Sequence, residues 1–233
     1  MSNPLKFLNK KNYGSIPHLL GSRRGQHDRF IEQGQDRIAT KKARDWKDTI
    51  WVTEKIDGHN VGIVKQGGKL YCVTRKGHLC EYSPFDAHKK FFNYYNLLSR
   101  YNSISLNVWH LDEGERLVFE WVDAENPCSI QYCCNSMIFL LDWFDANNNR
   151  KPYSQVIKMA GSLHCKLPRL IHVGAPVAPD KLIKQYDALK SNITNEQAEG
   201  MVYRVEREGK FDFMAKWVRD DFEAGKLLKG RNV

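Results

Sequence analysis

Residues 49–75 read TIWVTEKIDGHNVGIVKQGGKLYCVTR, and this stretch decides the fold class. Three runs in it are rich in β-branched and aromatic residues and are separated by glycine, aspartate and asparagine: 50–54, 61–65 and 70–75. The pair Gly67-Gly68 joins the last two runs as a hairpin. The stretch therefore predicts an antiparallel meander.

Further strands and helices follow on both sides of this meander. Strand patterns cover 116–122 and 137–144, and the turn at Glu208-Gly209-Lys210 joins 200–206 to 211–218 as a hairpin. Helical patterns cover 38–46, a segment that starts at Ser83-Pro84, 153–163 and 180–190. Because the helices interrupt the strands irregularly, we expect an α+β fold with antiparallel sheets flanked by helices.

Charge is concentrated near the N-terminus of the chain. The 233 residues carry a net charge of +9, and residues 1–47 hold 11 Lys/Arg against four Asp/Glu. A basic segment of this kind suits a polyanion such as nucleic acid or a nucleoside triphosphate, since neutralising phosphates releases counterions. A merely soluble basic surface is the alternative reading.

Composition excludes several other classes of protein. The six cysteines include no C-x-x-C pair, so neither a zinc ribbon nor a thioredoxin-like redox site is predicted. No signal peptide or membrane-spanning stretch is visible, and we expect a cytoplasmic location without membrane association. No linker divides the chain, so we expect one domain over 1–233, with the basic segment 1–47 packed on it.

The candidate for chemistry is the box Glu54-Lys55-Ile56-Asp57-Gly58, in which a lysine leaves an apolar strand and a glycine closes the turn. A lysine amine attacks phosphorus only when it is unprotonated, so its pKa has to fall from about 10.4 through desolvation, neighbouring cations or a metal. An exposed strand lysine is the alternative reading of the box taken alone.

Groups that such a lysine requires follow downstream. Arg75 ends a strand and suits a phosphate or ribose. Glu120 lies inside the apolar run 117–122, where an unpaired charge would be costly, so it needs a partner such as a hydroxyl, a metal or an arginine. Glu199 precedes Gly200 at the start of another strand, and Lys216 lies in the last one. Two acids aimed into one site suit a divalent cation.

These five boxes in this order resemble those of the RNA ligase family of covalent nucleotidyltransferases. The resemblance runs from 13–19 (YGSIPHL) and 37–40 (RIAT) to 212–219 (DFMAKWVR). It implies an ATP-grasp-like ligase adenylation domain around a nucleotide cleft. The chain is similar to compact bacterial and viral members that consist of little more than this domain, so no C-terminal OB domain is expected.

The resemblance also implies roles for single residues. Lys55 is the nucleophile that takes AMP from ATP, and Lys216 acts on the α-phosphate. Nucleotide contacts fall on Glu54, Asp57, Gly58, Arg75, Glu120, Leu141 and Glu199, and Glu120 and Glu199 would hold Mg²⁺ or Mn²⁺. The implied reaction is ATP-dependent RNA ligation by a monomer, in which AMP passes to an RNA 5′-phosphate and a 3′-hydroxyl then seals the strand.

Three positions depart from the family pattern. Leu141 stands where an aromatic residue usually stacks on the purine, so Phe139 or Trp143 are alternatives for that role. Phe119 replaces the usual glycine before Glu120, and Lys216 is followed by Trp217, Val218 and Arg219 rather than a second lysine two positions on. The competing functions are a nucleotide- or RNA-binding module without catalysis, and a capping guanylyltransferase or DNA ligase.

Overall fold

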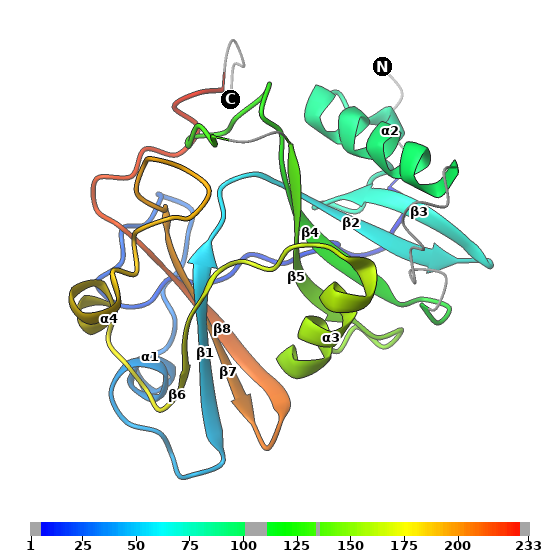
Figure 1. Cartoon of the computed structure of the whole chain (residues 1–233). Coiled ribbons are helices and arrows are strands. Elements are labelled where there is room, and N and C mark those ends of the chain that lie inside the picture. Colours follow the sequence, from blue (N-terminus) through cyan, green and yellow to red (C-terminus); the bar gives the residue numbers. More distant parts are fainter. Residues whose placement is uncertain (1–5, 101–110, 134–135, 229–233) are drawn as a thin grey trace. The chain divides into compact units, whose positions relative to one another are not determined.

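The computed structural model describes residues 6–100, 111–133 and 136–228 of the chain. It divides into two compact units, each built from three separate segments of the sequence. Unit 1 comprises Met1–Gly14, Gly58–Asn126 and Asn135–Leu167, and unit 2 comprises Ser15–Asp57, Pro127–Cys134 and Pro168–Val233. Each unit contains one four-stranded antiparallel sheet with helices (Figure 1), so the predicted α+β class is confirmed.

Unit 1 holds the sheet with strand order β3-β2-β4-β5. Its strands are β2 (His59–Gln66), β3 (Lys69–Thr74), β4 (Arg116–Val122) and β5 (Met137–Phe144). Gly67 and Gly68 both have positive φ, as the tight hairpin between β2 and β3 requires. The unit also contains the 3-10 helix η1 (Cys80–Tyr82) and the helices α2 (Asp86–Arg100) and α3 (Tyr153–Leu163).

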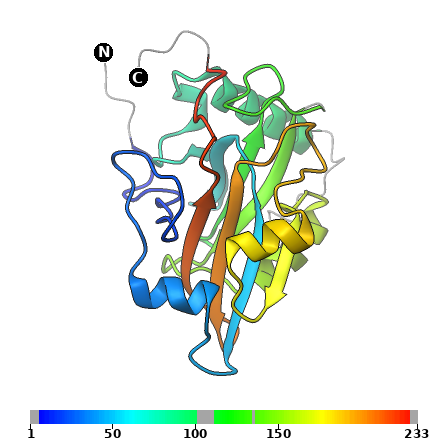
Figure 2. The ribbon, with the colours of Figure 1, turned by 90° about the vertical axis from the view of Figure 1, so that its left-hand side faces the viewer.

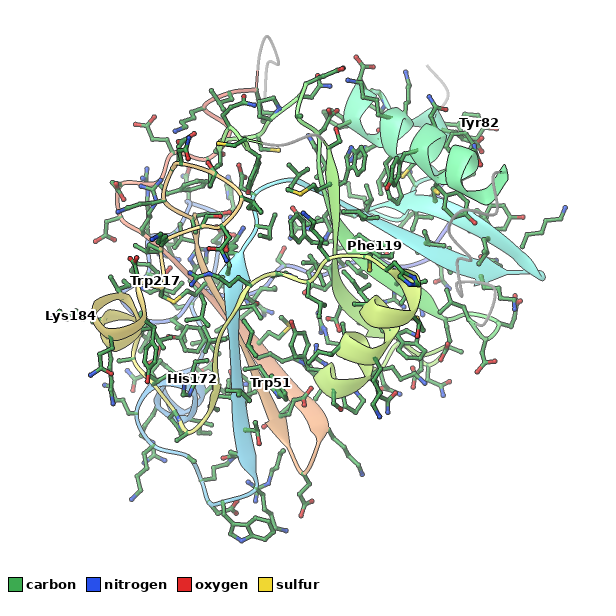
Figure 3. All side chains as sticks on the ribbon, in the orientation of Figure 1. Trp51, Tyr82, Phe119, His172, Lys184 and Trp217 are labelled. Atoms are coloured by element: carbon green, nitrogen blue, oxygen red, sulfur yellow. The ribbon has the colours of Figure 1, made fainter. Side chains whose placement is uncertain are left out.

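Helix α2 packs on one face of this sheet through its aromatic residues. The Phe91 side chain is 1% exposed, and its ring centroid lies 5.9 Å from that of Trp121 in β4. Phe119 of the same strand is buried, whereas Tyr82 lies at the surface (Figure 3). Because side chains alternate along a strand, Glu120 projects to the opposite face from Phe119 and Trp121.

Unit 2 holds the sheet with strand order β6-β1-β7-β8. The strands are β1 (Asp48–Lys55), β6 (Leu170–Gly174), β7 (Gly200–Arg207) and β8 (Lys210–Val218). The helices α1 (Gln33–Thr40) and α4 (Pro179–Tyr186) lie on one face of this sheet, which Figure 2 shows toward the viewer.

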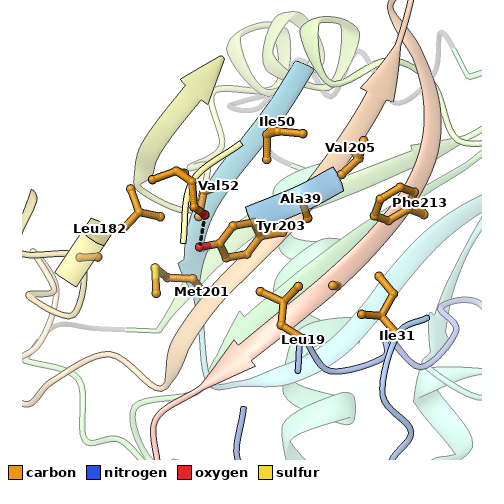
Figure 4. Packing of buried hydrophobic residues seen from close by; sticks show 13 residues of the cluster. Leu19, Ile31, Ala39, Ile50, Val52, Leu182, Met201, Tyr203, Val205 and Phe213 are labelled. Carbon is orange, nitrogen blue, oxygen red and sulfur yellow. Dashed lines mark hydrogen bonds between the residues drawn. The ribbon is translucent and has the colours of Figure 1, made fainter. Parts of the chain in front are cut away.

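That face carries the apolar core of unit 2 (Figure 4). Val52, Tyr203 and Ala215 lie side by side across β1, β7 and β8, and each side chain is fully buried. Ala39 of α1 and Leu182 of α4 belong to the same cluster. The Tyr203 hydroxyl donates a hydrogen bond to the Val177 carbonyl at 3.2 Å, so its one polar atom is satisfied within the core. The other face of the sheet is thereby left for polar chemistry.

Two sequence-based element assignments need correction. The predicted helix at 38–46 is wrong: α1 ends at Thr40. Beyond it, side chains of Asp45 and Asp48 accept the backbone N–H groups of Lys47 and Arg44, each at 2.9 Å, and hold residues 44–48 in a turn instead of a helix. The helix predicted to reach 190 ends at Tyr186, since the next residue adopts a left-handed conformation with φ of 48°.

The remaining strands and helices are confirmed within a few residues at each end. The predicted three-strand meander is wrong, because β1 pairs with β6 and β7 in one sheet, whereas β2 and β3 pair with each other in the other sheet. The helix expected from Ser83-Pro84 is α2, which begins at Asp86. The short strand β6 was not predicted. None of the helices in the described part of the chain combines the length and apolar character that a membrane crossing requires.

Candidate active site around Lys55

Lys55 is the last residue of β1, and its side chain lies on the sheet face opposite the core. In the register of unit 2, Lys55 pairs with Gly200, the first residue of β7. Glu199 therefore stands beside it, and the Lys55 Nζ donates a hydrogen bond to the Glu199 Oε2 at 2.5 Å. The two side chains are 22% and 10% exposed. The structure thus joins two predicted site residues that are 144 positions apart.

Burial changes the acid–base properties of Glu199. It raises the pKa of this carboxyl, which the positive charges of Lys55 and Lys216 partly oppose. A carboxylate with a raised pKa is a better proton acceptor, and it lies in direct contact with the amine. The pair therefore places an amine against a carboxylate that can accept a proton.

Lys216 lies on the same sheet face as Lys55. It pairs with Val202 of β7, which in turn pairs with Thr53 of β1, two residues before Lys55. Its Nζ is 3.8 Å from the Oδ2 of Asp28, and its side chain is 19% exposed. Because facing residues of neighbouring strands share a face, the register brings both lysines onto one surface.

His18 belongs to the same site, although the sequence analysis did not assign it a role. The backbone from Pro17 to Leu19 runs along β8: the N–H of Lys216 donates to the Pro17 carbonyl at 2.9 Å, and the N–H of Leu19 donates to the Lys216 carbonyl at 2.8 Å. The imidazole bridges Ser22 Oγ at 2.9 Å and Asp28 Oδ2 at 3.1 Å.

The electrostatics of His18 place it near both lysines. Its pKa is lowered first by burial and then by the positive charge of Lys216, with a smaller effect from Lys55, while Asp28 acts in the opposite direction. The neutral imidazole is therefore favoured. No local sequence signal marks His18 and Asp28, because only the pairing with β8 brings them to Lys216.

Glu54 projects to the opposite face from Lys55 and is 3% exposed. Ser191 Oγ donates a hydrogen bond to Glu54 Oε1 at 2.7 Å, and the Nε of Arg169 lies 3.6 Å from Oε2. Burial raises the pKa of Glu54, and both partners oppose that rise. Ser191 and Arg169 were also missed by the sequence analysis, since neither lies in a recognisable motif.

Asp57 fixes the turn that follows Lys55. Its Oδ2 accepts the backbone N–H groups of Ser129 at 2.6 Å and Ile130 at 2.9 Å, and its own N–H donates to the Tyr132 hydroxyl at 2.8 Å. Charge-assisted hydrogen bonds from a carboxylate to backbone N–H groups are strong ones. Asp57 thus connects the end of β1 to 129–132, a connection that the box alone does not reveal.

Gly58 and Glu120 lie together in unit 1. A Cβ on Gly58 would approach the Trp121 carbonyl oxygen to 2.7 Å and the Glu120 Cγ to 3.1 Å, so only glycine fits this close approach. Asn60, which pairs with Glu120 across β2 and β4, donates a hydrogen bond from Nδ2 to Glu120 Oε2 at 3.3 Å. The partner that an acid in an apolar strand needs is thus supplied in part by Asn60.

Arg75 and Leu141 are the other predicted site residues in unit 1. Arg75 follows the end of β3 and is exposed, and its carbonyl accepts the N–H of Asn12 at 3.0 Å. Leu141 is the extra residue of a β-bulge, since Leu140 pairs with Phe119 and Asp142 pairs with Val118. Phe139 pairs with Glu120 and therefore lies on the same face, with Phe139 3% exposed and Leu141 half-buried.

The two predicted metal ligands belong to different units, Glu120 to unit 1 and Glu199 to unit 2. Within the residues that the structure describes, no three His, Cys, Asp or Glu side chains are grouped so that they could hold a metal ion. A divalent ion at Glu199 would therefore take most of its ligands from phosphate oxygens and water, as Mg²⁺ commonly does.

Solved structures of DNA and RNA ligases have a fold similar to that of this chain. A putative ATP-dependent DNA ligase from Aquifex aeolicus superposes with a TM-score of 0.58 at 17% identity, over 88% of this chain and 49% of that one. Naegleria gruberi RNA ligase with PPi gives a TM-score of 0.57 at 12% identity, over 94% of this chain and 60% of that one.

An archaeal ATP-dependent RNA ligase gives a TM-score of 0.50 at 19% identity, over 74% of this chain and 43% of that one. The chain thus spans about half the length of these ligases. At such identities the likeness concerns the fold alone. No curated protein matches the sequence significantly.

The family itself follows from the sequence match. The model of the RNA ligase family matches residues 48–218, which run from the first residue of β1 to the last residue of β8. This span contains Lys55, Glu199 and Lys216, the three residues that unit 2 gathers on one sheet face. The chain belongs to the RNA ligase family.

Proposed function

We propose that this protein is an ATP-dependent RNA ligase that carries AMP on Lys55 before passing it to RNA. The observation that carries the proposal is the contact between Lys55 Nζ and Glu199 Oε2 at 2.5 Å, on the sheet face that also bears Lys216. Membership of the RNA ligase family and the ligase fold support it.

In the first step, the Lys55 amine attacks the α-phosphorus of ATP. A phosphorus–nitrogen bond forms, the bond to the β-phosphate oxygen breaks, and pyrophosphate leaves. Glu199 takes the amine proton, for which its raised pKa suits it. Lys216 offsets the negative charge that develops on the α-phosphate.

The positive charges of Lys55 and Lys216 suit a triphosphate. Lys55, Lys216 and the imidazole of His18 lie together, with Glu199 and Asp28 as the carboxylates that contact them. A divalent ion, when bound, would neutralise phosphate charge, with Glu199 as its carboxylate in unit 2. The further nucleotide contacts of this proposal are Glu54 in unit 2 and Arg75, Glu120 and Leu141 in unit 1.

In the next two steps the adenylyl group moves to RNA. An oxygen of the RNA 5′-phosphate attacks the adenylyl phosphorus, the bond to Lys55 breaks, and the amine regains its proton. A 3′-hydroxyl then attacks the activated 5′-phosphorus, which forms the phosphodiester and releases AMP. Each step exchanges one bond to phosphorus for another, so no oxidant or reductant is needed.

Joining of labelled RNA tests the proposal. The purified protein is incubated with ATP, Mg²⁺ or Mn²⁺, and RNA that bears a labelled 5′-phosphate and a free 3′-hydroxyl; the expected result is a longer or circular product that resists phosphatase. Lys55→Ala should remove this product, whereas Lys76→Ala, which changes an exposed turn lysine, should not.

Two outcomes would contradict the proposal. Joining by the Lys55→Ala variant would show that the amine is not required. If the wild-type protein seals DNA strands but not RNA strands, RNA is not the acceptor, although transfer of AMP to the protein would still hold.

A further inference from the structure

Trp46 is the most exposed large hydrophobic side chain in the described part of the molecule. It is 88% exposed, against 67% for Tyr82 and 53% for Tyr186. It lies in the loop between α1 and β1, at the end of β1 that is remote from Lys55 (Figure 1). A tryptophan in such a position contributes nothing to the core, so its presence there needs another explanation.

The backbone on both sides of Trp46 is held in place. Asp45 Oδ1 accepts the N–H of Lys47 at 2.9 Å, which closes a tight turn with Trp46 at its tip. The Arg207 guanidinium contacts both oxygens of Asp45, at 2.6 and 3.1 Å, and Asp48 at 3.0 Å. An exposed aromatic ring on a fixed turn loses little conformational freedom on binding, which favours its use as a contact.

One face of the indole already carries a cation. The Lys47 Nζ lies 5.8 Å from the ring centroid, and it is held by an ion pair with Glu208 in the β7–β8 turn. The N–H of Glu208 donates to the Lys47 carbonyl at 3.0 Å, which fixes the loop to that turn. Because the ring is otherwise exposed, its second face is open to a flat partner.

Lysines outnumber unpaired carboxylates in the segments next to the indole. Asp45, Asp48, Glu208 and Asp212 are each paired with a cation. Lys41, Lys42 and Lys210 make no ion pair with any residue that the structure describes. Protein interfaces are depleted in Lys and Asp at their centres, so an aromatic ring among free lysines suits nucleic acid better than an apolar protein groove.

We infer that Trp46 stacks on an unpaired base of single-stranded RNA while Lys41, Lys42 and Lys210 neutralise its phosphates. This inference rests on the proposed function, because it assigns part of the RNA grip to unit 2. We name this surface, made of Lys41, Lys42, Trp46, Lys47 and Lys210, the Trp46 platform. Stacking on an aromatic side chain tolerates any base, so the platform would select unpaired strands rather than a sequence.

The distance to Lys55 sets the length of RNA that can use the platform. Seven residue steps separate Asp48 from Lys55 along β1, which at about 3.3 Å per step span roughly 23 Å. A strand with its 5′ end at Lys55 needs about seven nucleotides to cover this span at roughly 3.4 Å each. Shorter RNA should reach the catalytic lysine without touching Trp46.

Binding of fluorescent 5′-phosphorylated oligouridylate to the full chain tests the inference. Trp46→Ala should weaken binding of a strand of about 12 nucleotides by roughly 5- to 150-fold, the range that base stacking commonly gives. Trp46→Phe, which keeps an aromatic ring, should lose less affinity for this strand. A strand of about four nucleotides, and a blunt duplex of the same length as the long strand, should bind the variants and the wild type equally.

Tyr82→Ala is the matched control, since it removes an exposed aromatic ring from unit 1, and it should leave RNA binding unchanged. Transfer of AMP from ATP to the protein should also be unchanged in Trp46→Ala, which shows that the variant is folded.

The inference is overturned if Trp46→Ala binds the long strand as tightly as the wild type, or loses duplex binding to the same extent. Wild-type protein that acquires AMP yet binds no RNA would overturn both this inference and the RNA acceptor of the proposed function. Weaker binding of long single strands by Trp46→Ala, with unchanged binding of short strands and duplex, supports the Trp46 platform.

Discussion

In the proposed mechanism the Lys55 amine has to lose a proton, and Glu199 is the group that we propose accepts it. Burial of the Glu199 carboxyl raises its pKa and makes the carboxylate more basic, while the contact with Lys55 at 2.5 Å partly opposes that rise. A neutral amide at 199 could still accept a hydrogen bond, but it could not accept the proton.

Glu199→Gln is therefore expected to slow transfer of AMP to the protein by about 10²- to 10⁴-fold, the usual range for a lost general base. Single-turnover labelling with ATP measures the rate. Glu196→Gln is a suitable control, because Glu196 is a partly exposed glutamate whose ion pair is with Lys226. Equal rates for Glu199→Gln and the control would rule out Glu199 as the proton acceptor.

The histidine beside Lys216 gives the protein a predictable dependence on pH. The pKa of His18 is lowered in the folded protein from its usual 6.5, so the unfolded chain binds the proton more readily. The stabilisation from neutral His18 is thus present above pH 6.5 and is lost as the pH falls below it. Urea midpoints at several pH values should fall toward acid, and His18→Gln should show a shallower fall. Parallel curves of urea midpoint against pH for the wild type and His18→Gln would contradict the lowered pKa of His18.

Strands β7 and β8 set the spacing between Glu199 and Lys216 through the close approach of Gly200 to β8. A Cβ at Gly200 would overlap the Trp217 carbonyl oxygen and lie 2.9 Å from its carbonyl carbon. Both are backbone atoms of the strand that carries Lys216, so they cannot move aside without moving β8.

Gly200→Ala should accordingly destabilise the protein by roughly 1–3 kcal/mol, as overpacking generally does, and should also reduce labelling of Lys55. The matched change is Gly161→Ala in α3, where nothing lies within 4 Å of the new methyl group. The free energy of unfolding of Gly161→Ala should rise by up to about 1 kcal/mol, since alanine favours helix more than glycine does. Denaturant unfolding measures the change in stability of both variants, which should have opposite signs. Two changes of the same sign would refute the packing argument.

Sequence patterns predicted the elements that have strong local signals. The hairpin of β7 and β8 has Glu208-Gly209 at its turn, both with positive φ, between two long β-rich runs. Strand β6 was missed because Leu170–Gly174 is short and none of its residues is fully buried, so its pattern lacks the alternation of a half-buried strand. Helix α1 was misplaced because its sequence is mostly polar and its N-cap residue, Glu32, makes no side-chain capping bond.

Some residues of the candidate site could likewise be predicted from the sequence, and others could not. Lys55, Glu199 and Lys216 could be found because each lies in a recognisable box, and the register of unit 2 brings them together. His18, Ser191 and Arg169 could not, since their places depend on contacts between segments that are far apart in the sequence. Asp57 was found, but its bonds to 129 and 130 could not be foreseen from the box.

The chain as a whole is a polycation, and this property should govern its binding of RNA more than its chemistry with ATP. The net charge is +9, from 36 Lys/Arg against 27 Asp/Glu. Affinity for RNA should fall steeply between about 50 and 200 mM salt, because bound cations release counterions from phosphates. Labelling of Lys55 at saturating ATP should change much less over this range. A flat salt dependence of RNA binding, measured by fluorescence polarisation, would contradict this expectation.

The central claim is that one amine, that of Lys55, becomes covalently bonded to phosphorus. The most direct measurement is mass spectrometry of the protein after incubation with ATP and a divalent ion, followed by mapping of the modified peptide. One added AMP on the peptide that contains Lys55, and none in Lys55→Ala, is the predicted result. AMP on another residue, or its persistence in Lys55→Ala, would contradict the claim.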